Sequence, residues 1–246
     1  MPKKEDAIDQ MSQVRQDVRK RMDEAIAAIL ALCWYYRSED FSFSDNIALQ
    51  REANKILIQM SNGNLSDAEK RAKLALAEAD LQEDVEDALE YSEGDISGED
   101  MIYRLDRQAD HLRDLLEGWL VAAAACSLTK EQVIRNLWAH LADPASSKYW
   151  KQARLKQPRW GRGFQLDLLS AMTVIQQDMI NRSFQYARIR SFQRSGAIGY
   201  RTIRQSTFYC PLCDEMSKKI WSFDELVLPY HPRCVCKAIP VFNSEL

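Results

Sequence analysis

Residues 210–246 constrain the fold of this chain most, because they concentrate cysteine and histidine. Four of the six cysteines and one of the three histidines lie there, spaced C-x2-C, then 17 residues, then H-x2-C-x-C. Thiolate and imidazole are the ligands of tetrahedral zinc. The spacing therefore predicts a structural zinc knuckle, with more candidate ligands than a zinc ion needs: Cys210, Cys213, His231, Cys234 and Cys236. The alternative is a set of buried thiols or a disulfide pair.

The surplus of protein ligands favours a structural role for the ion. A catalytic zinc keeps one coordination position open for water, which a full set of protein ligands would occupy. We find no acid, base or nucleophile elsewhere in the chain that would work with this cluster. We therefore expect no catalytic residues, no enzyme activity and no small-molecule substrate.

The sequence pattern before the cysteine-rich segment predicts a series of helices. Three-and-four spacing of apolar residues indicates a helix over residues 6–37, interrupted on its apolar side by Arg15. A second helix is predicted from a Ser44-Asp45 cap to residue 60, ended by Asn62-Gly63-Asn64. Ser66 with Glu69 has capping-box spacing and predicts a third, acidic helix to residue 91.

Further helices follow the loop at residues 92–98. One is predicted from residue 100 to 125, and another from a capping box at Thr129 and Gln132 to Pro144. A short helix through Lys151 precedes a breaker at residues 158–163. The last helix, residues 164–194, carries an apolar stripe and ends at Gly196, which suits a left-handed cap. The stripe consists of Phe164, Leu168, Met172, Ile175 and Met179.

After Gly196 the pattern changes to that of strands, predicted at residues 198–203, 220–223 and 235–241. We therefore predict a mainly α fold: a multi-helix N-terminal body, residues 1–163, and a C-terminal domain, residues 164–246. That domain would comprise the long basic helix, residues 164–195, and a small α+β zinc-knuckle module, residues 197–246. A module that small needs its metal for stability.

Charge is unevenly distributed along the chain. Residues 66–100 carry thirteen acidic and three basic side chains, whereas residues 148–204 carry two acidic and twelve basic ones. Arginines near Trp150 and Trp160 suit phosphate contacts and base stacking. We favour contact with protein instead, either the acidic helix of this chain or a neighbouring subunit. The candidate contact residues are Lys148, Lys151, Arg154, Lys156, Arg159, Arg162, Arg182, Arg188, Arg190 and Arg194. The acidic helix itself is interpreted as a solvated face.

Neither a signal peptide nor a membrane span is predicted, because the longest apolar runs fall short of the roughly 20 residues that a bilayer requires. We therefore expect synthesis in the cytoplasm, where a reducing environment favours thiols as metal ligands over disulfides.

The stretch from residue 181 onward resembles the C-terminal domain of the Mu F-like family of phage minor head, or head morphogenesis, proteins. The family's pattern is an Arg- and Ala-rich helix, a glycine, a strand of the form G-Y-x-x-x, a C-x2-C pair and a closing P-x-H-P-x-C-x-C. Here Cys210 and Cys213 match the pair, and the closing element matches at Pro229, His231, Pro232, Cys234 and Cys236. Two positions depart from the pattern: Ser206 stands where Asp is usual and Val235 where Arg is common.

This resemblance covers about the last quarter of the chain. It implies a non-enzymatic structural protein of a tailed phage or prophage, located in the virion at the portal vertex or head interior and in the host cytoplasm during assembly. The implied partners are the portal protein, other head proteins and packaged DNA.

The alternative function is a zinc-dependent DNA-binding or nuclease protein. A nuclease of the metal-finger type would need a second histidine or an acid beside His231. That histidine has only Tyr230 and Pro232 as neighbours.

Overall fold

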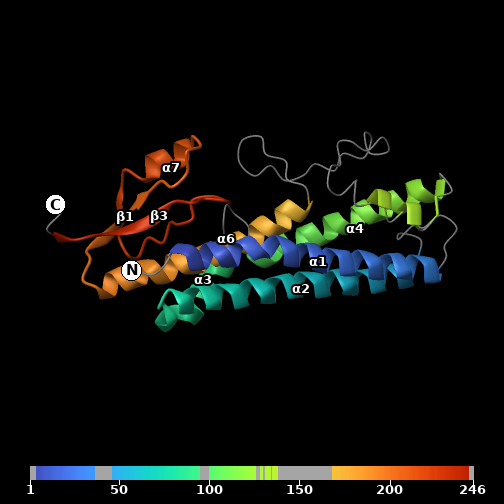
Figure 1. The fold of residues 1–246 in the computed structure, drawn as a ribbon, viewed down its shortest axis with the longest axis horizontal. Coiled ribbons are helices and arrows are strands. Elements are labelled where there is room, and N and C mark those ends of the chain that lie inside the picture. Colours follow the sequence, from blue (N-terminus) through green and yellow to red (C-terminus); the bar gives the residue numbers. More distant parts are fainter. Residues whose placement is uncertain are drawn as a thin grey trace. The chain divides into compact units, whose positions relative to one another are not determined.

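The structure, a computed structural model, describes residues 4–36, 46–94, 100–125, 128–129, 131–133, 135–137 and 168–243. These residues form a mainly helical fold with one small antiparallel sheet (Figure 1). Their helices are α1 (Lys4–Tyr36), α2 (Ile47–Glu78), the short 3-10 helix η1 (Gln82–Asp84), α3 (Val85–Glu93), α4 (Met101–Ala125), α6 (Leu168–Arg194) and α7 (Pro211–Met216). No helix in these ranges has the length and apolar character that spanning a bilayer requires.

The chain divides into two compact units, each built from separated stretches of sequence. Unit 1 comprises residues 1–14, 66–102 and 174–246, and unit 2 comprises residues 15–65 and 103–173. These units do not coincide with the predicted division between residues 163 and 164. That boundary lies outside the described residues.

Unit 2 has an apolar core supplied by consecutive turns of its helices. Val18, Met22 and Ile29 are fully buried in α1, as the predicted spacing requires. The guanidinium of Arg15, which interrupts that spacing, donates a hydrogen bond to Ser170 Oγ at 3.0 Å. Leu49 of α2 is fully buried as well.

Helix α2 contradicts the predicted stop at residues 62–64, because it continues unbroken to Glu78. A Cβ atom on Gly63 would lie 2.3 Å from Nη1 of Arg21, so the glycine makes room for that guanidinium. Asn64 is 1% exposed, so its side chain lies in the interior and the residue is not part of an exposed turn. Packing has overridden a helix propensity that disfavours glycine by about 1 kcal/mol.

The ends of α2 also lie elsewhere than predicted. Asn46 Oδ1 accepts the Leu49 N–H at 3.0 Å and caps the start of the helix, while the predicted cap, Ser44-Asp45, lies outside the described residues. Ser66 lies inside α2 and starts no helix. The acidic segment is instead divided after Glu78, where Asp80 adopts a φ of +57°.

The prediction for α4 is confirmed, and so is the following capping box. Thr129 N–H donates to Gln132 Oε1 at 2.9 Å, and Gln132 N–H donates back to Thr129 Oγ1 at 3.4 Å. Four predicted features lie outside the described residues: the helix end at Pro144, the short helix through Lys151, the breaker at residues 158–163 and the start of the last helix.

Helix α6 carries the predicted stripe, but it is buried on far more than one side. Leu168, Met172, Ile175 and Met179 are all at most 1% exposed. The polar side chains of the same helix are covered too: Ser170, Thr173, Gln176, Asp178, Arg182, Ser183 and Gln185 are buried. Much of this helix therefore lies within the protein interior.

Gly196 ends α6 as predicted, with a φ of +83°. Ala197 N–H donates to Phe192 O and Gly196 N–H donates to Gln193 O, both at 3.2 Å. This pair of bonds is the Schellman motif, which satisfies the last helix carbonyls and turns the chain toward the sheet.

The sheet consists of β1 (Gly199–Ile203), β2 (Ile220–Trp221) and β3 (Lys237–Val241) in the order β2-β1-β3, with both pairings antiparallel. Strands β1 and β3 lie side by side in Figure 1. These strands confirm the three predicted segments, although β2 is shorter than expected. The inner face of the sheet covers a core that contains Ile189, Tyr200, Trp221, Leu228 and Ala238.

Strand β3 is an outer strand of the sheet, and Pro240 lies on it. The Ala238 N–H donates to Gln185 Oε1 at 3.4 Å, so it points away from β1. Backbone direction repeats every second residue along a strand, so the nitrogen of Pro240 also points outward. The nitrogen of Pro240, which has no hydrogen to donate, therefore lies on the outer edge of the sheet. It does not interrupt the side of β3 that pairs with Tyr200.

Candidate metal centre

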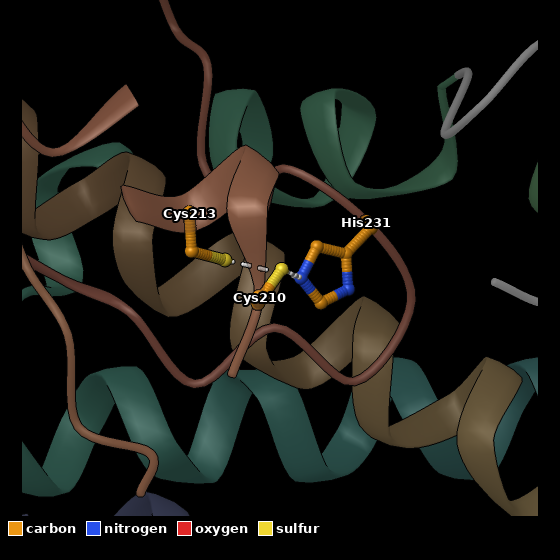
Figure 2. Close-up of side chains that lie close together, drawn as sticks. All are labelled: Cys210, Cys213 and His231. Carbon is orange, nitrogen blue, oxygen red and sulfur yellow. Dashed lines mark hydrogen bonds between the residues drawn. The ribbon is translucent and has the colours of Figure 1, made fainter. Parts of the chain in front are cut away.

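All five predicted ligands gather at one place in unit 1. Cys210, Cys213 and His231 have their ligand atoms within 4.8 Å of one another, and so do Cys213, Cys234 and Cys236. The Nε2 atom of His231 lies 3.4 Å from Cys210 Sγ and 3.1 Å from Cys213 Sγ (Figure 2). Cys213, which belongs to both groups, lies 3.9 Å from Cys234, sulfur to sulfur. These Cys/His groups could bind a metal ion.

The first pair of cysteines is positioned by α7, which the sequence analysis missed. Cys210 is the N-cap of this short helix, Pro211 occupies its first turn, and Cys213 is buried one turn on. A helical turn brings residues three apart to the same face. Pro after a cysteine, followed by Asp214 in the first turn, is a helix-start signal that could have revealed α7.

A hydrogen bond selects the ring nitrogen that His231 offers to a metal. Its Nδ1 lies 2.7 Å from the carbonyl oxygen of Pro232. A carbonyl only accepts, so Nδ1 carries the proton and Nε2 has its lone pair free toward the sulfurs. Metal-binding histidines commonly have such a partner on the second nitrogen.

The thiols differ in how readily they lose a proton. Burial raises the pKa of Cys213 to about 12. The hydrogen bond from Cys236 lowers the pKa of Cys234 to about 5, against the effect of burial, and the same interaction raises the pKa of Cys236. Burial works to lower the pKa of His231, but its bond to Pro232 and the nearby sulfur charges raise it overall. Thiol protons must leave when a metal binds, so binding here would be pH-dependent.

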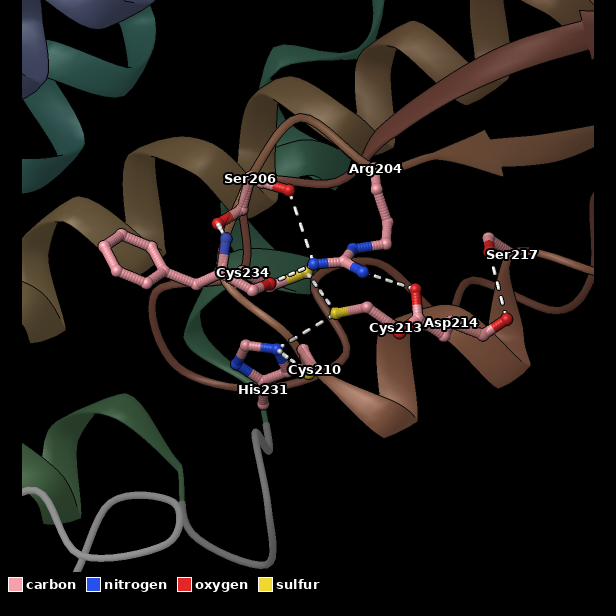
Figure 3. Close-up of polar contacts among 9 residues, drawn as sticks. Arg204, Ser206, Cys210, Cys213, Asp214, Ser217, His231 and Cys234 are labelled. Atoms are coloured by element: carbon pink, nitrogen blue, oxygen red, sulfur yellow. Dashed lines mark hydrogen bonds and ion pairs between the residues drawn. The ribbon is translucent and has the colours of Figure 1, made fainter.

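Arg204, just after β1, holds the segment that leads to the first cysteine. Its Nη1 pairs with Asp214 Oδ1 at 2.5 Å, and its Nη2 donates to the carbonyl oxygens of Ser206, at 3.3 Å, and of Phe208 (Figure 3). The Ser206 hydroxyl accepts the Phe208 N–H at 3.1 Å. Serine thus supplies an oxygen acceptor to the backbone of the segment that leads to Cys210.

Helices α3 and α6 hold the segment that carries the second group of ligands. Gln185 of α6 donates to the carbonyl of Cys236 and accepts from Ala238 N–H, both at 3.4 Å. Tyr91 of α3 donates its hydroxyl to Leu226 O at 2.7 Å, upstream of His231. Sequence reasoning missed both residues, since each lies far along the chain from the ligands that it serves.

The described cysteines are all free, namely Cys33, Cys210, Cys213, Cys234 and Cys236. The disulfide alternative is therefore not what these residues adopt. Cys33 is buried in unit 2, and burial raises its pKa to about 12.

The predicted basic contact residues have varied surroundings. Arg194 pairs with Glu83 at 3.3 Å and Asp84 at 2.6 Å, so it meets the acidic segment of its own chain. Arg182 is buried and lies over the ring of Tyr91 at 4.2 Å. Arg188 lies over the ring of Phe192 and Arg190 over that of Tyr186. The other six predicted contact residues lie outside the described residues: Lys148, Lys151, Arg154, Lys156, Arg159 and Arg162.

Comparisons with protein-family models, curated proteins and solved structures found no match to this chain. The site is therefore defined by its own geometry: a Cys/His cluster in which Cys213, Cys234 and Cys236 are buried and Cys210 and His231 half-buried, a fixed histidine tautomer and hydrogen bonds from two helices to the segment that carries the candidate ligands.

Proposed function

We propose that this chain is a minor head or head morphogenesis protein of a tailed phage or prophage, acting as a structural component at the portal or head interior. One observation carries the proposal: the motifs that resemble the Mu F-like pattern fold together as one connected structure. Arginine-rich α6, Gly196, strand β1 and the C-x2-C pair follow one another, and the closing H-P-x-C-x-C meets the first pair in space. A shared structural role explains why residues so far apart in sequence converge.

The ion that fits this cluster best is Zn²⁺, in a structural role. Sulfur and nitrogen ligands at about 2.3 Å and 2.0 Å from a tetrahedral zinc lie roughly 3.6–3.8 Å from one another. The contacts at this site measure 3.1, 3.4 and 3.9 Å. Cys210, Cys213 and His231 would supply three ligands, and Cys234 or Cys236 the fourth. The ion would join α7 to the segment before β3 and thereby fix the module.

Metal analysis tests the zinc centre directly. Protein purified without added metal should contain about one zinc per chain, because the ligands form one cluster. Cys213→Ser should lose the metal, since this thiol belongs to both ligand groups. Cys33→Ser should keep it. A folded, metal-free wild-type protein would rule out the zinc centre.

Co-purification tests the assembly role. The chain should bind the portal protein encoded beside it when the two are co-expressed, and salt should weaken the complex if basic side chains contribute. A gene that lies apart from any portal or terminase gene, together with no portal binding at low salt, would overturn this role.

The alternative, a zinc-dependent DNA-binding or nuclease protein, gains no specific support from the described residues. Their two ligand groups contain no carboxylate. Asp214, the acidic residue that directly follows Cys213 in the sequence, forms a salt bridge with Arg204. A nuclease assay on metal-loaded protein, with plasmid DNA and Mg²⁺, should therefore find no cleavage.

A further inference from the structure

Two candidate ligands, His231 and Cys234, are the ends of one tight turn. Cys234 N–H donates to the carbonyl oxygen of His231 at 3.0 Å, and Pro232 and Arg233 are the central residues. Arg233 has a φ of +63°. Proline followed by a residue of positive φ is the pattern of a type II turn, which prefers glycine or asparagine at the second position. Arginine is strained there, so the turn needs support from outside.

That support comes from α6. Asp178 Oδ1 accepts the Arg233 N–H at 2.9 Å, and Asn181 Nδ2 donates to the Cys234 carbonyl oxygen at 3.0 Å. Asp178 and Asn181 are three residues apart and therefore share a helix face. They hold a peptide group at the strained residue and another just after the cysteine.

The burial of Asp178 makes its role informative. Asp178 is only 3% exposed, on a helix that is buried along much of its length. A carboxylate is costly at such a place unless hydrogen bonds compensate its charge, and a charge-assisted bond to a backbone N–H is a strong one. An apolar residue would pack there at lower cost but could not hold Arg233.

We propose that Asp178 and Asn181 are positioning residues of the metal centre, which hold the strained turn so that His231 and Cys234 face one ion. The inference rests on the proposed zinc centre and adds that α6 pre-arranges half of it. The metal therefore meets a turn that is already formed and does not have to impose the positive φ itself.

The decisive measurement is zinc affinity of the full chain, by competition with a chromogenic chelator, together with the absorption spectrum of the Co²⁺-loaded protein. Asp178→Ala should weaken zinc binding about 10- to 100-fold, the usual effect of removing a group that orients a metal ligand. Asp178→Asn keeps an oxygen acceptor and should retain most of the affinity. Asn181 is less buried, so Asn181→Ala supplies a variant that depends less on folding.

Two further variants separate positioning from general stability. Ser183→Ala is the matched control, because this buried α6 hydroxyl donates only to carbonyls of its own helix, at 2.7 and 3.4 Å. It should leave zinc affinity and the Co²⁺ spectrum unchanged. Arg233→Gly added to Asp178→Ala should recover part of the lost affinity, because glycine adopts a positive φ without support. A merely destabilising role for Asp178 would give no such rescue.

Equal affinity in Asp178→Ala and Ser183→Ala, or no rescue by Arg233→Gly, would overturn the positioning role. Hydrogen exchange of the metal-free protein separates this failure from failure of the zinc centre. Asp178→Ala should speed exchange of the Arg233 amide even without metal, and unchanged exchange would also overturn the role. A wild-type chain that binds no zinc would instead refute the centre itself.

Discussion

Two glycines of the C-terminal module have different reasons to be glycine. Gly196 has a φ of +83°, and a Cβ there would meet nothing within 4 Å. A Cβ on Gly199 would lie 2.7 Å from the carbonyl oxygen of Trp221, a backbone atom of strand β2. The first glycine meets a conformational requirement, and the second allows two strands to approach.

Gly199→Ala should therefore lower the free energy of unfolding by about 1–3 kcal/mol, because backbone must move to admit the methyl group. Gly196→Ala should cost about 1–2 kcal/mol, the penalty of the left-handed conformation alone. Urea unfolding of the two variants measures both values. The close approach would be refuted if Gly199→Ala were as stable as wild type.

His111, on α4, should make the stability of the fold depend on pH. Burial lowers its pKa, although Asp114 works in the opposite direction. The unfolded chain then binds a proton more readily than the folded chain, so stability should fall as pH drops below the unfolded pKa of about 6.5. His111→Gln should remove this component, which chemical unfolding at a series of pH values from 7.5 to 5 would detect. A parallel decline in the variant would assign the effect to other groups.

At the residue scale, the candidate ligands were easier to predict than the residues that hold their segment in place. Cysteine and histidine at these spacings have few other uses, and the five residues that they single out do cluster in the structure. Asp178 and Asn181 were not predicted, because polar residues on a helix usually face water. Nothing in the neighbouring sequence indicates that these two contact the ligand segment instead. Asp178 lies 55 positions from the residue that it holds.

At the element scale, helices were predicted well and their interruptions poorly. Apolar spacing identified α1, α4 and most of α6, and strand patterns identified the sheet. The Asn62-Gly63-Asn64 stretch has every local sign of a turn, yet α2 continues through it because Gly63 admits the Arg21 side chain. Local sequence cannot report a contact made by a residue 42 positions earlier.

Helix α3 contacts the segment that carries the candidate ligands through the hydroxyl group of Tyr91. Tyr91→Phe should lower the free energy of unfolding by about 1–2 kcal/mol, because it removes the donor to Leu226 O and Leu228 O but keeps the ring. Tyr186→Phe is the matched control and should have a smaller effect; the ring of Tyr186 lies 5.2 Å from that of Tyr91 and is tilted against it. Thermal unfolding measures both. Equal effects would show that these hydroxyl bonds contribute little.

At the scale of the whole molecule, the candidate metal centre lies in unit 1, whose three stretches of sequence come from both ends and the middle of the chain. The segment beyond Gly196 therefore does not depend on an ion alone to be held in place. It is bonded to α6 by Asn181 and Gln185 and to α3 by Tyr91.

Chelation should consequently loosen this unit without abolishing helical structure. A ligand that binds only the folded state stabilises it by about 4 kcal/mol when its free concentration is 1,000 times Kd, and a chelator removes this contribution. Wild type should thus lose thermal stability on chelation, whereas Cys213→Ser should be insensitive. Cys33→Ser, at a buried thiol of unit 2, should remain as sensitive as wild type. Far-UV circular dichroism and calorimetry provide the readouts.

Pro240 has a consequence for how copies of this protein behave when they are crowded together. Its nitrogen lies on the open side of the outer strand β3, and the neighbouring donor on that side, Ala238 N–H, is already taken by Gln185. An outer strand without free donors is a poor template for a strand of another molecule. The β3 edge of the sheet is therefore poorly suited to edge-to-edge pairing with a second molecule.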